Sequence, residues 1–125
     1  MNEVAGKIQE SELEVMHVLW GSEGALPLSV IRNVLHDRCS WEDSTVKTLL
    51  RRLQAKGAVE LVSRGQYRAV LTESEYNEWA SHRMIDRLYH GSAKNLVASL
   101  VNDGSLSQED IAELRAFLEE VGGCD

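Results

Sequence analysis

The sequence predicts a mainly α-helical protein with one small β-hairpin, arranged as a winged helix-turn-helix followed by an all-helical region. Three segments with helical apolar spacing precede two short β-prone runs, and three more helical segments follow them. The 125 residues are enough for one compact domain or two small cooperating units. We therefore expect a winged-helix domain over residues 1–72 and a helical domain over residues 73–125.

The first two helices are expected at residues 11–20 and 28–38. Ser11 and Glu14 have the S-x-x-E spacing of a capping box, which starts a helix. The stretch GSEGALP then interrupts the helical pattern. Pro27 suits a position near the start of the second helix, because its missing N–H would have no partner there.

The third helix is expected at residues 43–56, with either Ser40 or Asp43 as its N-cap. Its apolar residues recur at i, i+3, i+4 and i+7 and therefore share one side. Gly57 follows in the position of a C-cap glycine. The other side of this helix is polar and basic, and it carries Ser44, Thr45, Lys47, Thr48, Arg51 and Arg52.

The runs AVELVS and QYRAVL are separated by Arg64-Gly65, which is the pattern of a β-hairpin whose glycine supplies a positive φ. Thr72 and Glu75 form a second capping box, opening a fourth helix that ends near residue 89. The fifth and sixth helices are expected at residues 93–101 and 108–121, the last with Ser107 as its N-cap.

Positive charge is concentrated on the third helix and the hairpin. The whole chain has a net charge of −7, yet the stretch from Trp41 to Arg68 holds six basic and three acidic residues, a net charge of +3. The remaining residues hold seven basic and seventeen acidic groups, a net charge of −10. A ligand responds to charge within a Debye length, about 8–10 Å in physiological salt, so this local excess favours an anionic partner.

A helix with such a face fits the major groove of DNA. We expect groove-facing roles for Ser44, Thr45, Lys47, Thr48 and Arg51. Arg52 and Lys56 are assigned to phosphates, and Arg64 at the tip of the wing to the backbone or the minor groove. The alternative is a solvated helix face that binds nothing, since amphipathic helices usually carry Lys and Arg on the outside.

Other classes of function lack a motif. The chain has no HExxH, GxSxG or phosphate-cradling glycine loop, so we expect no enzyme. Its two cysteines, Cys39 and Cys124, form no CxxC pair, and we expect neither a metal site nor a cofactor. No apolar signal core or membrane-length apolar run occurs, so a cytoplasmic protein is expected.

Three stretches carry a resemblance that spans nearly the whole chain: ESELEVMHVLW, WEDSTVKTLLRRLQAKGAV and LVASLVNDGSLSQEDIAELRAFLEEV. With them the sequence resembles the penicillinase-repressor and copper-operon-repressor family of small bacterial winged-helix repressors. The resemblance implies a sequence-specific transcriptional repressor that binds an inverted-repeat operator of TACA/TGTA type as a homodimer. The alternative is a winged-helix module that binds proteins and never DNA.

The resemblance also implies that the C-terminal helices form the dimer. Their apolar faces agree, because they carry more core-type residues than so short a region can bury alone. The alternative is that these residues pack back on the winged helix. The expected interface residues are Tyr76, Trp79, Met84, Leu88, Leu96, Leu100, Ile111, Leu114 and Leu118.

This chain differs from members of the family in two regulatory features. Copper-responsive members carry paired C-terminal cysteine motifs, whereas this chain has Cys124 alone, which does not favour metal sensing. Antibiotic-responsive members are cleaved at an Asn-Phe bond in the fifth helix, and Ser99-Leu100 lies at that place in this chain. The releasing signal is therefore unidentified, although the resemblance implies an antibiotic- or metal-stress type.

Overall fold

A computed structural model describes residues 2–122 of the chain. By its internal contacts the chain divides into two compact units, unit 1 over Met1–Ser81 and unit 2 over His82–Asp125. This division falls inside the fourth α-helix. The domain boundary expected between residues 72 and 73 remains a prediction.

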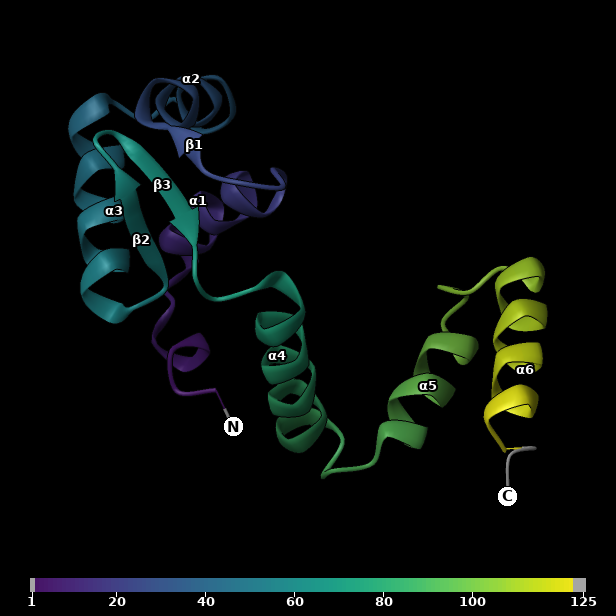
Figure 1. Ribbon diagram of the computed structural model, residues 1–125. Coiled ribbons are helices and arrows are strands. Elements are labelled where there is room, and N and C mark those ends of the chain that lie inside the picture. Colours follow the sequence, from purple (N-terminus) through teal and green to yellow (C-terminus); the bar gives the residue numbers. More distant parts are fainter. Residues whose placement is uncertain (1, 123–125) are drawn as a thin grey trace. The chain divides into compact units, whose positions relative to one another are not determined.

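Unit 1 is a small helical domain with a three-stranded antiparallel sheet (Figure 1). The strands lie in the order β1-β3-β2, and β2 and β3 form the predicted hairpin. Three α-helices precede this hairpin, as expected for a winged helix. The elements of unit 1 are η1 (Ala5–Lys7), α1 (Glu10–Trp20), β1 (Leu26–Pro27), α2 (Leu28–Cys39), α3 (Asp43–Lys56), β2 (Val59–Ser63), β3 (Gln66–Ala69) and the first part of α4 (Glu73–Leu88).

The core of unit 1 is built on the predicted apolar side of α3. The buried side chains of this helix are Val46, Leu49, Leu50 and Leu53, none more than 4% exposed. They pack in one cluster with buried residues of α1, α2 and β2. Burying an aliphatic side chain of this size contributes about 1.5–3 kcal/mol, so four on one helix hold α3 firmly against the domain.

The ends of the helices are partly as predicted. Gly57 ends α3 at φ 83°, and Gly65 turns the hairpin at φ 71°, both in the left-handed region that favours glycine. The prediction of a capping box at Ser11 and Glu14 was wrong. Helix α1 begins at Glu10, its N-cap is Gln9, and the backbone N–H of Gln9 donates to Glu12 Oε1 at 2.8 Å.

The N-cap of α3 also differs from both alternatives, because Glu42 occupies that position. Ser40 instead follows the end of α2, at φ 58°. The connection from α2 to α3 is therefore short, and it consists of Ser40, Trp41 and Glu42.

Strand β1 was missed by the sequence analysis. It has only two residues, and it exists because Leu26 and Pro27 pair with Tyr67 and Gln66 of β3. The N–H of Leu28 also donates to the carbonyl of Gly65 at 2.8 Å. Proline is tolerated in such an edge strand, and a partner so distant in sequence leaves no local pattern.

Unit 2 contains the rest of α4 together with α5 (Ala93–Asn102) and α6 (Gln108–Gly122). The predicted helices agree with these bounds to within one residue at each end for α5 and α6. Ser107 caps α6 as expected, since Asp110 N–H donates to its Oγ at 3.0 Å. Among the described residues, no helix is both long enough and apolar enough to cross a membrane.

Candidate nucleic-acid interface

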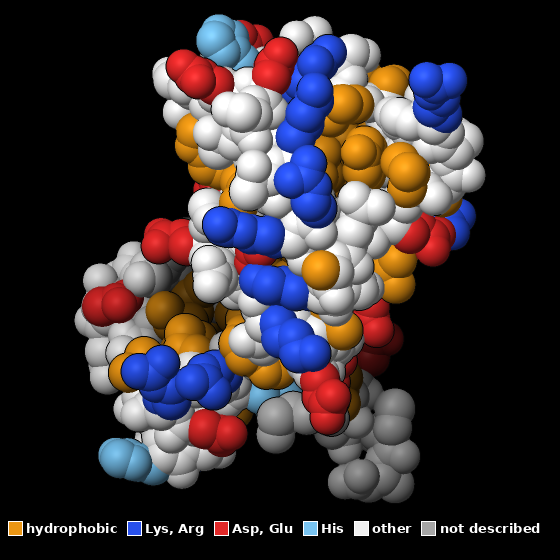
Figure 2. Space-filling model, turned by 90° about the vertical axis from the view of Figure 1, so that its left-hand side faces the viewer, with side chains coloured by type: hydrophobic (Ala, Val, Ile, Leu, Met, Phe, Trp, Pro, Cys, Tyr) orange, Lys and Arg blue, Asp and Glu red, His pale blue; other side chains and the backbone are white. Residues whose placement is uncertain are grey.

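The outer side of α3 is a polar and basic surface. Because its apolar stripe faces the core, the opposite residues project from the domain. Figure 2 views this side of the molecule and shows Lys and Arg side chains following one another across it. Six residues predicted to contact DNA are exposed here: Ser44, Thr45, Lys47, Thr48, Arg51 and Arg52.

The acid at the start of α3 has a partner. Arg32 Nη1 on α2 lies 3.4 Å from Asp43 Oδ2 in an exposed ion pair. This contact offsets the one carboxylate that α3 carries, so the field at its N-terminal turn is less negative than the sequence implies. The positive end of the helix dipole adds to the attraction for an anion at the same turn.

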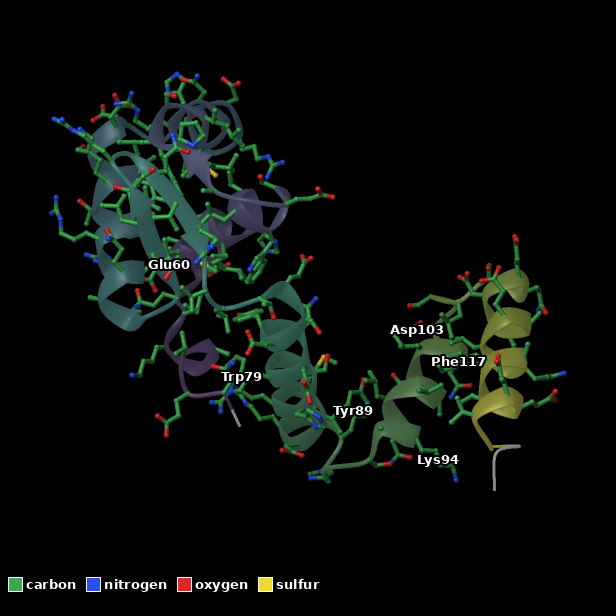
Figure 3. All side chains as sticks on the ribbon, in the orientation of Figure 1. Glu60, Trp79, Tyr89, Lys94, Asp103 and Phe117 are labelled. Atoms are coloured by element: carbon green, nitrogen blue, oxygen red, sulfur yellow. The ribbon has the colours of Figure 1, made fainter. Side chains whose placement is uncertain are left out.

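The hairpin presents one arginine at its tip. Arg64 lies in the turn between β2 and β3 and is exposed. Arg68, by contrast, is paired with Glu60 across the two strands (Figure 3 labels Glu60). In the part of the chain that the structure describes, Arg64 makes no ion pair, so its guanidinium is available to a ligand.

Lys56 differs from the other residues assigned to DNA. Its ammonium lies 2.5 Å from Glu12 Oε1 and 2.9 Å from the carbonyl oxygen of Lys7. Glu12 is completely buried, whereas the Lys56 side chain is 23% exposed. The contacts of Lys56 therefore tie the C-terminal end of α3 to α1, and its predicted phosphate contact gains no support.

A groove on one flank of α3 includes residues that the sequence analysis did not select. Its volume is about 370 Å³, and Ser11 of α1 and Trp41 of the connection to α3 line it together with Ser44, Thr45, Thr48, Leu49 and Arg52. The spacing of Ser44, Thr48 and Arg52 by four residues could have indicated a shared flank. Nothing in the sequence placed Ser11 opposite that flank.

Two of the residues expected at a dimer interface have packing partners inside unit 1. Tyr76 lies with its ring centroid 5.7 Å from that of Trp20 and 5.8 Å from that of Trp79. Trp79, labelled in Figure 3, lies over Gly6, where an added Cβ would be 3.5 Å from its ring. These two residues thus pack back on the winged helix, the alternative left open by the sequence, and their interface role remains a prediction.

The other seven expected interface residues retain solvent exposure. Leu96, Leu100 and Ile111 are half-buried, and the rest are more open: Met84 39%, Leu88 66%, Leu114 42% and Leu118 63% exposed. Among the described residues of α4, α5 and α6, none is buried. These helices therefore display apolar faces without a core of their own.

The residues at the two positions where this chain departs from the family, and the other cysteine, are placed as follows. Ser99 and Leu100 lie within α5 and are half-buried. Cys39 is a half-buried free thiol at the end of α2. Cys124 lies outside the described residues.

Comparison with known proteins agrees with this architecture. A model of the penicillinase repressor family matches residues 8–120. The chain is 35% identical to the penicillinase repressor of Bacillus licheniformis, over 91% of each chain. It is 31% identical to the methicillin resistance regulatory protein MecI of Mammaliicoccus sciuri, over 91% of this chain and 94% of that one.

A solved structure shares the fold of the larger part of this chain. The solution structure of the DNA binding domain of the repressor BlaI matches with a TM-score of 0.53 and 30% identity. The match covers 61% of this chain and 94% of that domain. The fold, the family model over residues 8–120 and the curated relatives agree, and this chain belongs to the penicillinase repressor family.

Proposed function

We propose that this protein is a sequence-specific DNA-binding transcriptional repressor and not an enzyme. The observation that carries the proposal is the exposed polar and basic face of α3, held outward by four buried residues on its opposite side. Such a helix fits the major groove, where Arg and Lys bind guanine edges and Thr methyl groups contact thymine. The relative named as a penicillinase repressor, the one named as a methicillin resistance regulatory protein, and the DNA binding domain of the repressor BlaI all support the same activity.

In this proposal α3 enters the major groove and the hairpin contacts the flanking backbone. Lys47 and Arg51 have no ion pair within residues 2–122, so both are free to bind DNA. Arg64 at the tip of the hairpin would reach the backbone or the minor groove. Bound at a promoter, the protein would block polymerase. Because its proposed ligand is DNA, we infer that it acts in the cytoplasm.

We further propose that the protein acts as a homodimer on an inverted repeat of TACA/TGTA type. The support is the set of exposed apolar side chains on α4 and α6, where Leu88, Phe117 and Leu118 are each at least 60% exposed. Displaying so many aliphatic side chains to water is unfavourable, and a second copy would cover them. Two copies of the chain related by a two-fold axis match the symmetry of an inverted repeat.

The DNA proposal is tested by fluorescence anisotropy of the full chain on a labelled TACA/TGTA inverted repeat and on a scrambled duplex, over a series of salt concentrations. We expect preference for the repeat and an affinity that falls steeply with salt, by about 0.9 units of log–log slope for each phosphate neutralised. Arg51→Ala should cost about 1–3 kcal/mol on the repeat and reduce the preference. Lys94→Ala removes the same charge from α5 and serves as the control.

Equal, salt-independent binding to both duplexes would contradict this proposal and favour the alternative, a winged-helix module that binds proteins.

The dimer is tested separately by analytical ultracentrifugation of Leu118→Glu, which places a charge on the apolar face of α6. Ala116→Glu places the same charge on the opposite side of that helix as a control. We expect only the first variant to sediment as a monomer, and identical behaviour would overturn the assignment of this face.

A further inference from the structure

The groove beside α3 brings together side chains from three parts of unit 1. Ser44, Thr48 and Arg52 are spaced by four residues and form one row along the flank of α3. Ser11, the second residue of α1, faces this row, and Trp41 lines the groove from the connection that precedes α3. The buried Leu49 supplies an apolar part of its wall.

The chemistry of the groove is that of an anion site. None of its seven lining residues is acidic, although the chain holds 20 acids and 13 bases. Ser11, Trp41, Ser44, Thr45 and Arg52 all carry side-chain N–H or O–H donors, and within residues 2–122 none of these donors meets an acceptor. The hydroxyl of Thr48 alone is engaged, because it donates to the carbonyl of Ser44 at 2.9 Å.

We propose that this groove binds a backbone phosphate of the DNA duplex, with Ser11 and Trp41 as additional DNA-binding residues. This inference rests on the proposed function and deepens it. Several neutral donors with one guanidinium suit a singly charged phosphodiester, and the half-buried indole offers an apolar surface to the neighbouring sugar. A volume of about 370 Å³ leaves room for a phosphate together with part of its sugar.

Duplex DNA is favoured over a free phosphate ion by the position of the groove. It opens on the exposed side of α3, and it shares Ser44, Thr45 and Thr48 with the face assigned to the major groove. When that face meets the bases, the flank of α3 lies against the DNA strand whose backbone borders the major groove. A phosphate contact there fixes the depth and register of α3.

The groove also separates the basic residues on the outer side of α3 into two sets. Lys47 and Arg51 do not line it, whereas Arg52 does. Contacts to bases carry sequence preference, while contacts to phosphates strengthen binding to every sequence equally. The proposal therefore predicts two classes of variant: those that lower the preference for the operator and those that weaken all DNA binding in parallel.

Two variants test the groove while leaving every fully buried core residue unchanged, although Trp41 packs against the edge of the core. Trp41→Phe keeps an aromatic ring but removes the indole N–H, and Ser11→Asp brings a negative charge into the groove. Aspartate is favourable in the first turn of a helix, so Ser11→Asp should leave α1 folded. Ser74→Asp is its matched control, because Ser74 is likewise the second residue of its helix and does not line the groove.

The measurement is anisotropy of each full-length variant on the inverted repeat and on the scrambled duplex. We expect Ser11→Asp to weaken binding to both duplexes by about tenfold or more, which corresponds to the loss of one charge-assisted contact. Trp41→Phe should weaken both to a smaller extent, and the ratio between the duplexes should stay constant. Ser74→Asp should remain close to the wild type.

A neutral methylphosphonate, placed in turn at each phosphate of the repeat, identifies which phosphate the groove contacts. One position should weaken the wild type but produce little further loss in Ser11→Asp, the signature of a direct contact in a double-mutant cycle. Inorganic phosphate, added at constant ionic strength, should not protect this contact; specific competition with the wild type alone would indicate a free-ion site and overturn the duplex assignment.

Two further outcomes are distinguishable. If the wild type prefers the repeat and both groove variants match it, the groove does not hold a phosphate and the DNA proposal stands. If the wild type binds neither duplex, the proposed function fails and this inference fails with it.

Discussion

Glu12 is a carboxylate enclosed by unit 1, with no exposed surface. Its Oε1 accepts from the Lys56 ammonium at 2.5 Å and from the Gln9 N–H at 2.8 Å. Its Oε2 has no hydrogen-bond partner among the described residues. A buried charge of this kind depends on its counter-ion, because removing one partner leaves the other ionised in a medium of low polarity.

Lys56→Met should therefore lower the free energy of unfolding by about 3 kcal/mol or more. Urea denaturation followed by circular dichroism measures the loss. Lys47→Met is the control, since Lys47 is exposed on the same helix and makes no ion pair within the described residues. Similar stabilities for the two variants would contradict the structural role of Lys56, and a lower salt slope of DNA binding in Lys56→Met would restore its predicted phosphate contact.

Gly57 is required at the end of α3 for its backbone conformation and not for a side-chain contact. Its φ of 83° is costly for a residue with a Cβ, although an added Cβ would meet no atom within 4 Å. Gly57→Ala should thus destabilise unit 1 by about 1 kcal/mol through backbone strain alone. Gly24→Ala, which also meets open space but lacks a positive φ, should have no such cost in the same denaturation experiment.

Among the elements, α4 begins with a reciprocal pair of hydrogen bonds. Thr72 N–H donates to Glu75 Oε1 at 2.9 Å, and Glu75 N–H donates to Thr72 Oγ1 at 3.1 Å. This is the capping box that the sequence predicted. The pKa of Glu75 is lowered, first by the hydrogen bond from the Thr72 backbone and then by the Thr72 side chain.

This lowered pKa predicts a pH dependence for the start of α4. A carboxylate whose pKa is lower in the folded state contributes stability above its unfolded value, about 4.3, and the contribution is lost as the pH falls through the folded pKa. Glu75→Gln should remove this dependence. The stability difference between wild type and variant, followed by denaturation from neutral to acidic pH, should hold above about pH 5 and shrink below it. A constant difference would contradict the cap, and Glu78→Gln is the exposed control.

For the whole molecule, the division between units bears on which fragment folds alone. Trp20 Nε1 donates to the carbonyl of Leu71 at 2.8 Å, and Tyr76 and Trp79 extend this contact along the first part of α4. Unit 1 as the contacts define it therefore includes two aromatic residues beyond the boundary expected at residue 72.

A fragment of residues 1–81 should consequently be more stable than one of residues 1–72, by about 2 kcal/mol or more for two half-buried aromatic rings. Urea denaturation of the two fragments compares them directly. Both should bind DNA more weakly than the full chain if unit 2 forms the dimer. Equal stability would show that Tyr76 and Trp79 add nothing to unit 1.

The sequence by itself determined the features that depend on neighbouring residues. The apolar period of α3, the glycine after it, the capping box at Thr72, the N-cap at Ser107 and the basic face were all predictable, because each arises from side chains within one or two helical turns. The charge separation between the stretch around α3 and the rest of the chain was likewise a matter of composition. Together these features predicted the fold class and most of the candidate surface.

Only the tertiary structure decided what depends on contacts between distant segments. Strand β1 exists through β3, some 40 residues away, and Lys56 finds Glu12 across 44 residues. The groove likewise joins Ser11 to a flank of α3, and the aromatic residues of α4 meet Trp20. Such pairings have no period along the chain. They arise when packing of the buried side of α3 brings separate elements together, which is why a local pattern predicted Lys56 as a DNA contact and could not predict its partner.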